Sequence, residues 1–176
     1  MKDLREKVRD ERTLLKKIEL AIPGFRGYRK REDLRIADSM LRDYLANQMD
    51  LVEDELKIIR KILSRRMMME VLEDLSSLVN RMSALEGKVR HAEQGYMGLV
   101  GDYRVDEPEL NRVYEFDLSL IGKIKLLKEK AEHLHDVAKK GGIDDVIECI
   151  EEMDEVLSEF DELFDTRRNV MLEVFK

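Results

Sequence analysis

Apolar residues recur every three or four positions over four long stretches of this chain. Such spacing places the apolar side chains along one face of a helix. It predicts four long amphipathic helices over about 30–64, 67–93, 107–140 and 144–174. The first two stripes comprise Leu41, Leu45, Met49, Val52, Leu56, Ile59 and Leu63, and then Val71, Leu75, Leu78, Met82, Leu85, Val89 and Ala92. The last two comprise Leu110, Val113, Asp117, Leu120, Ile124, Leu127, Ala131, Leu134 and Ala138, and then Ile143, Val146, Ile150, Met153, Leu157, Phe160 and Phe164.

A shorter helix with a thin apolar stripe precedes them over 1–21, and it is expected to lie at the periphery. Pro23 and Gly24 end it, because proline restricts the residue before it and glycine permits a left-handed turn. Asp144 is expected to cap the last helix. The fold class is therefore all-α, a single domain over 1–176 in which two antiparallel hairpins, 29–93 and 107–175, form a bundle with coiled-coil-like packing.

The connection near residue 64 leaves two alternatives open, because no glycine or proline interrupts the pattern there. One continuous helix of about 60 residues would span about 90 Å and could assemble as an intertwined dimer. Helices of that length are rare, so a turn at 64–66 that makes a hairpin is favoured.

Composition agrees with long helices, since charged residues make up 40% and hydrophobic residues 43%, with nine glycines and two prolines. A single cysteine, Cys149, excludes an intrachain disulfide and suggests a reducing compartment. We expect a soluble, cytoplasmic protein without a signal peptide or a membrane span. Scarce Asn and Gln with abundant Glu, Lys and Arg suggest a heat-adapted source.

Charge is unevenly distributed along the chain. Residues 1–66 hold 18 Lys and Arg against 13 Asp and Glu, whereas residues 67–176 hold 14 against 26. The two parts are expected to pack against one another, within a chain or between copies, or the basic part is expected to meet an anionic partner.

Basic and aromatic side chains crowd the two glycine loops, 22–31 and 94–105, which a hairpin topology brings to the same end of the bundle. We name this the loop end. Its candidate binding residues are Phe25, Arg26, Tyr28, Arg29, Lys30, Arg31, Arg35, Tyr96, Tyr103 and Arg104. The simpler interpretation is structural: the tyrosines cover the core and the arginines bridge to the acidic last helix.

Asp117 interrupts an apolar stripe, and a buried carboxylate needs a partner. We expect a structural ion pair, with Arg35, Arg42, Arg81 and Arg90 at comparable height along the bundle. Arg167 lies on the stripe of the last helix and has the same interpretation.

Catalytic and metal signatures are weak. Glu132 and His135 have the Glu-x-x-His spacing of di-iron bundles, but no second such pair occurs, so a solvated helix face is expected. No phosphate loop, dinucleotide fingerprint or nucleophile constellation is readable. No cofactor and no catalytic residue are predicted, although an enzyme built in the bundle stays a third alternative.

Two segments resemble a group of uncharacterised helical proteins of prokaryotes. They are Ile-Pro-Gly-Phe-Arg-Gly-Tyr-Arg-Lys-Arg-Glu from residue 22 with the helix start after it, and Gly-Tyr-Met-Gly-Leu followed by Asp-Glu-Pro-Glu-Leu-Asn-Arg-Val-Tyr-Glu-Phe-Asp-Leu. The resemblance implies no activity.

The sequence therefore predicts a non-enzymatic interaction or scaffold protein that binds a protein partner or itself through the loop end. The alternative is polyanion binding, to nucleic acid or an anionic membrane, through basic residues 26–35, with Phe25 and Tyr28 available for stacking.

Overall fold

Five α-helices and one short 3-10 helix make up the computed structural model, which describes residues 4–28, 31–92 and 107–174, and no strand occurs in these ranges. The all-α bundle predicted from the sequence is confirmed. The helices are α1 (Leu4–Ala21), α2 (Arg31–Arg65), α3 (Leu72–Arg90), α4 (Glu107–Lys140) and α5 (Ile143–Val174), with the 3-10 helix at Met69–Val71.

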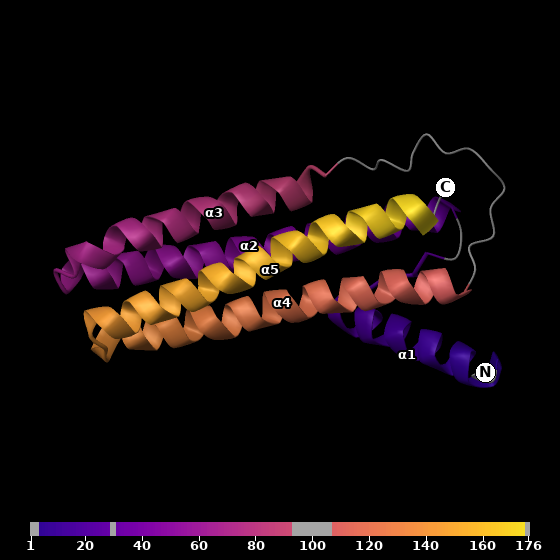
Figure 1. Cartoon of the computed structure of the whole chain (residues 1–176), viewed down its shortest axis with the longest axis horizontal. Coiled ribbons are helices and arrows are strands. Elements are labelled where there is room, and N and C mark those ends of the chain that lie inside the picture. Colours follow the sequence, from indigo (N-terminus) through magenta and orange to yellow (C-terminus); the bar gives the residue numbers. More distant parts are fainter. Residues whose placement is uncertain (1–3, 29–30, 93–106, 175–176) are drawn as a thin grey trace.

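Two helical hairpins lie side by side and form the bundle (Figure 1). α2 pairs with α3, and α4 pairs with α5. Between the hairpins α2 contacts α4 and α3 contacts α5, so that α2 and α5 lie on one diagonal of the bundle and α3 and α4 on the other. Helix α1 packs on α4. The chain reverses at each successive long helix, as predicted, but neighbours from different hairpins run parallel (Figure 1).

The turn predicted at 64–66 is confirmed, and the main chain explains how it forms without glycine. Met67 has a positive φ of 58°. Its N–H donates to the Ser64 carbonyl at 3.1 Å, and the Met68 N–H donates to the Leu63 carbonyl at 3.1 Å. This is a Schellman motif with methionine in the left-handed position that glycine usually occupies. One continuous rod, and with it the intertwined dimer, is therefore wrong.

Met67 gives a prediction about stability, because its side chain is 81% exposed and contributes little burial. Replacing Met67 with glycine removes the strain of the left-handed conformation, so we expect the free energy of unfolding to rise by about 0.5–1 kcal/mol. Urea denaturation measures it. Met69→Gly is the matched control: Met69 is also exposed but has no positive φ, so it should gain nothing.

Helix lengths differ from the prediction in one place. α3 has 19 residues, against 35, 34 and 32 for α2, α4 and α5, because the Schellman turn and the 3-10 helix occupy the start of the stretch predicted as 67–93. The cap of α5 also differs: Asp145, not Asp144, accepts a hydrogen bond from the Gly142 N–H, at 2.7 Å.

The two hairpin turns lie at the end of the bundle opposite the loop end, which we call the distal end. Here Arg66 donates to the carbonyls of Ala138 (2.7 Å) and Gly141 (2.9 Å) and joins the two turns.

The basic side chains at the end of α2 do not pair with the acidic side chains of the last described helix. The carboxylates of α5 form ion pairs with cations of α3 and α4, for example Asp154 with Arg81, and Asp161 with Lys88. Since α2 lies across the diagonal from α5, its basic C-terminal part does not meet these carboxylates. Within the described ranges Arg60, Lys61 and Arg65 form no ion pair. Within one chain, the end of α2 therefore does not pair with the acidic segment as expected, and pairing between copies stays a prediction.

Candidate functional site

The loop that joins α1 to α2 is fixed to the bundle by three side chains spaced three residues apart. Ile22, Phe25 and Tyr28 are all buried. Gly24 and Gly27 have φ values of 87° and 79°, which allow the chain to turn between these contacts. The Tyr28 ring stacks on Tyr114 of α4, with ring centroids 5.4 Å apart, and it meets the Phe25 ring edge-on at 5.6 Å.

Tyr28 belongs to a buried polar cluster, which we call the Tyr28 network. Its hydroxyl donates to Asp117 of α4 at 2.5 Å and accepts from Arg167 of α5 at 2.9 Å. Arg167 also donates to Asp117 at 2.6 Å and, across the diagonal of the bundle, to Asp38 of α2 at 2.8 Å. Arg42 donates to Asp38 at 2.9 Å. The network therefore joins the loop to α2, α4 and α5.

The Tyr28 network balances two aspartates against two arginines. Burial raises the pKa of the Asp117 carboxyl, while Arg167 and the Tyr28 hydroxyl oppose this rise. Burial acts to lower the pKa of Arg167, but Asp117 and Asp38 hold it well above its usual value, so the guanidinium stays charged. Charges buried in this way are stable only when each has its partner.

Tyr28 gives a prediction about pH. Burial first, and Asp117 second, raise the pKa of its hydroxyl well above 10.0. The folded state therefore holds this proton more tightly than the unfolded state, so the stabilisation is complete below pH about 10 and is lost as the pH rises beyond it. Tyr28→Phe should cost about 1–3 kcal/mol at pH 7. The difference from the wild type should shrink above pH 10 in urea titrations.

Tyr44→Phe is the control for this experiment. Burial raises the pKa of Tyr44 as well, but this side chain is only half-buried on α2. A smaller effect at every pH is expected. If the free energies of unfolding of the wild type and Tyr28→Phe differ by the same amount from pH 7 to 11, the Tyr28 hydroxyl is not buried as described.

The candidate residues of the loop end separate into three groups: buried, exposed, and outside the described part of the chain. Phe25 and Tyr28 are 2% and 1% exposed, so the stacking on a ligand anticipated for them does not fit their burial. Arg26 and Arg35 are exposed. Arg31 is the first residue of α2, but its side chain lies outside the described part of the chain. The other five candidates lie outside it with their main chain as well. These five are Arg29, Lys30, Tyr96, Tyr103 and Arg104. Figure 1 shows the loop, the start of α4 and the end of α5 at the same end of the bundle.

Asp117 lies in an ion pair with Arg167. None of the four arginines that the sequence analysis expected at the height of Asp117 along the bundle pairs with it. Arg42 reaches it only through Asp38, and Arg81 instead pairs with Asp154. Sequence reasoning missed Asp38. A signal was present, because one step of three residues back from Leu41 along the stripe of α2 leads to Asp38.

The network extends to the end of α3 through main-chain and side-chain contacts. Arg42 donates to the carbonyl oxygen of Arg90 at 3.0 Å. Arg90 in turn donates to Asp50 at 2.8 Å and to Asn47 at 3.2 Å. All four long helices therefore contribute to the polar contacts at this end.

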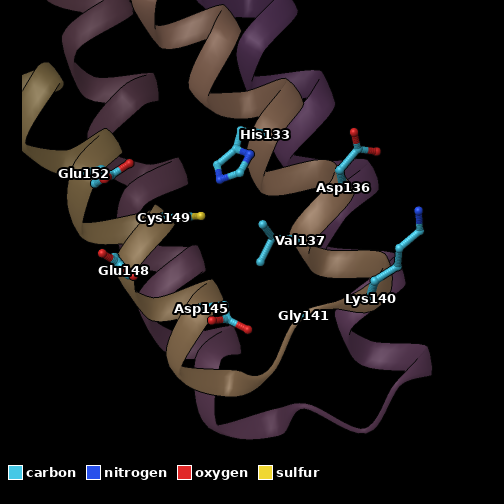
Figure 2. A pocket seen from close by; sticks show the side chains of 9 residues that line it. All are labelled: His133, Asp136, Val137, Lys140, Gly141, Asp145, Glu148, Cys149 and Glu152. Carbon is cyan, nitrogen blue, oxygen red and sulfur yellow. The ribbon is translucent and has the colours of Figure 1, made fainter.

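A shallow groove of about 540 Å³ lies between the end of α4 and the start of α5 (Figure 2). Figure 2 shows His133 and Cys149 on facing helices at this groove. Burial raises the pKa of the Cys149 thiol, and Glu152 and Glu148 raise it further. A thiol in this environment is a poor nucleophile, because the thiolate is the reactive form. The groove is lined by His133, Asp136, Val137, Lys140, Gly141, Asp145, Glu148, Cys149 and Glu152.

The Glu-x-x-His pair on α4 does not form the fully solvated face that was expected. Glu132 is exposed, but His135 is partly buried and forms an ion pair with Glu55 of α2 when protonated. Within the described ranges, no group of three or more His, Cys, Asp and Glu side chains is arranged to hold a metal ion. None of the described helices is both long and apolar enough to span a membrane.

Comparisons with known proteins complete this picture. Models of protein families, curated proteins and solved structures give no match to the chain.

Proposed function

We propose that this chain is a non-enzymatic interaction protein of the cytoplasm, a helical scaffold that binds other macromolecules through exposed helix faces. One observation carries the proposal. Large apolar side chains remain in solvent along α2 and just beyond its end, although the bundle buries most of its other large apolar residues. They are Ile36, Leu51, Ile58, Met67 and Met69, with exposed fractions of 59%, 54%, 44%, 81% and 63%.

Three cations that have no ion pair among the described residues lie beside these apolar side chains, namely Arg60, Lys61 and Arg65. Exposed apolar side chains rimmed by charged ones are typical of surfaces that bind a partner. The buried polar groups support a non-enzymatic role. The donors and acceptors of the Tyr28 network bond to one another rather than facing a bound substrate. The thiol at the groove of α4 and α5 is held in its unreactive form.

Crosslinking in the cells that produce the protein tests this function. A photoreactive amino acid is placed at Ile58, at Arg26 of the loop end, or at Glu155 on the exposed face of α5 as the control. We expect adducts of defined mass from Ile58 and none from Glu155. Adducts from Arg26 alone would assign the contact to the loop end, and the absence of adducts from all three positions would contradict the proposal.

Polyanion binding is the second candidate function, and the anchoring of the loop favours it. Phe25 and Tyr28 hold the loop against the bundle, so that Arg26 between them is presented to solvent, and Arg35 is exposed near the start of α2. Binding here would be electrostatic and would weaken steeply with salt.

A salt series with DNA, RNA and anionic liposomes tests this candidate. The loop-end variant changes Arg26, Arg29, Lys30 and Arg31 to glutamate, and the matched variant changes Lys57, Arg60, Lys61 and Arg65 at the distal end of α2. Salt-sensitive binding that only the loop-end variant loses supports the candidate. No binding by the wild type at low salt would exclude it.

A further inference from the structure

The outer face of α2 repeats the spacing of its buried face. Six exposed residues lie along it at alternating steps of four and three, which is the period of a coiled-coil seam. They are Asn47, Leu51, Asp54, Ile58, Lys61 and Arg65. We call them the outer seam. α2 contacts α3 and α4 within the bundle, and the exposure of the outer seam shows that these contacts leave it uncovered.

The charges of α2 are divided about the middle of this seam. From residue 43 to 55 the chain has five acidic side chains and no basic one: Asp43, Asp50, Glu53, Asp54 and Glu55. From residue 56 to its end at residue 65, α2 has four basic side chains and no acidic one: Lys57, Arg60, Lys61 and Arg65. Glu55 is already paired with His135 of α4, but the other charges still divide the exposed face of α2. A face divided in this way is complementary to itself when it is turned by 180°.

We propose that a second copy of this chain binds the outer seam, with the two α2 helices antiparallel about a twofold axis that passes between Asp54 and Glu55. In this register Leu51 of one copy packs on Ile58 of the other, and the symmetry repeats the contact. Both side chains, 54% and 44% exposed in the single chain, are then covered. The inference rests on the proposed function, since it names the partner of the α2 surface.

The same register brings opposite charges together on the flank of the seam. Asp50 comes beside Lys61 of the second copy. Asp54 comes beside Lys57 of the second copy, in addition to the Lys57 of its own chain, with which it pairs at 3.0 Å. Within its own chain Asp50 also pairs with Arg90 at 2.8 Å, whereas Lys61 has no ion pair among the described residues. A groove of about 590 Å³ lined by Lys57, Arg60, Lys61, Ser64 and Arg65 receives the acidic half of the partner helix.

The acidic half of the seam argues against a polyanion as the occupant. A nucleic acid or an anionic membrane that contacts Lys61 and Arg65 along the helix would also approach Asp50 and Asp54, and like charges repel. A second copy matches the outer parts of both halves, because it presents basic side chains to the acidic half and acidic ones to the basic half. Only Asp54 and Glu55, at the axis itself, meet the carboxylates of their counterparts.

Sedimentation equilibrium of the full chain tests the dimer. We expect a dimer for the wild type and an increase of at least about 100-fold in the dissociation constant for L51D/I58D, since two buried apolar contacts are replaced by carboxylates. L20D is the matched control, because Leu20 is an exposed apolar residue of α1, 78% exposed, away from the seam. Circular dichroism verifies that every variant is folded.

Crosslinking through cysteine tests the register. In a C149A background, D54C lies close to its own counterpart across the twofold axis, so a short bismaleimide should join the two copies. R65C lies near residue 44 of the partner, about 30 Å along the helix axis from its own counterpart at 1.5 Å per residue. It should not crosslink to itself.

Each outcome decides the question. A wild-type monomer at all concentrations, a dimer that L51D/I58D leaves intact, or equal crosslinking at residues 54 and 65 would overturn the antiparallel dimer. If the chain is a monomer but Ile58 still forms adducts with another macromolecule in cells, only the dimer fails. If both experiments are negative, the proposed function fails as well.

Discussion

Replacing Arg167 with methionine is expected to lower the free energy of unfolding by about 3–5 kcal/mol, the largest loss that we expect from a single side chain of the Tyr28 network. Methionine keeps the length of the apolar stem but removes the guanidinium. Asp117 and Asp38, which are 0% and 3% exposed, then lose the donors that Arg167 directs at them. Urea denaturation at pH 7, followed by circular dichroism, measures the change.

Arg168→Met is the control, because Arg168 is the exposed neighbour of Arg167 on α5. Its effect should stay within about 0.5 kcal/mol. Adding Asp117→Asn to Arg167→Met removes the charge that has lost its cation and should restore part of the loss, whereas Asp38 keeps Arg42. Equal effects of the two methionine variants would contradict the buried ion pair.

Replacing Gly27 with alanine should cost about 2–5 kcal/mol. Two causes add: Gly27 has a positive φ of 79°, which strains any residue with a Cβ by about 1–2 kcal/mol, and overpacking a rigid site costs about 1–3 kcal/mol. A Cβ built on Gly27 would overlap the hydroxyl oxygen of Tyr114, which accepts the Tyr28 N–H at 3.1 Å. Tyr114 cannot easily retreat, because it is fully buried and stacked on Tyr28.

Gly24→Ala separates the two causes. Gly24 has a similar φ of 87°, but a Cβ there would meet only the end of the Met40 side chain, at 3.6 Å. It should show the backbone cost alone, so Gly27→Ala should be the more destabilising of the two in thermal or urea unfolding. Tyr114→Phe added to Gly27→Ala should recover part of the difference. Equal losses for both alanine variants would show that Tyr114 adapts.

The helices were predictable because each long helix buries one stripe of apolar side chains, which leaves its period in the sequence. The same stripes place Asp117 and Arg167 in the core. The ion-pair partner of Asp117 was not predictable in this way. A stripe shows which face of a helix is buried, but not which helices lie next to one another in the bundle. The four arginines considered for Asp117 lie on α2 and α3, whereas the residue that pairs with it lies on α5.

The loop was misjudged for a different reason. Phe25 and Tyr28 occur among arginines and glycines, a composition typical of an exposed binding loop. Their spacing from Ile22 carried the opposite information, since three side chains at intervals of three point to one side of a compact turn. The burial of an irregular loop depends on the surface beneath it, here Tyr114 and Asp117 of α4, which lie far away in the sequence.

The order in which the ribosome makes these residues gives the Tyr28 network a further consequence. Asp38 is synthesised together with its partner Arg42 on α2, but Asp117 follows on α4 and its partner Arg167 belongs to α5. A nascent chain that has completed only α1 to α4 therefore has a carboxylate at Asp117 without its cation, and burying it would be costly. Chains interrupted before Arg167 would stay open and accessible to proteases, so that closure of the bundle depends on synthesis of its last described helix.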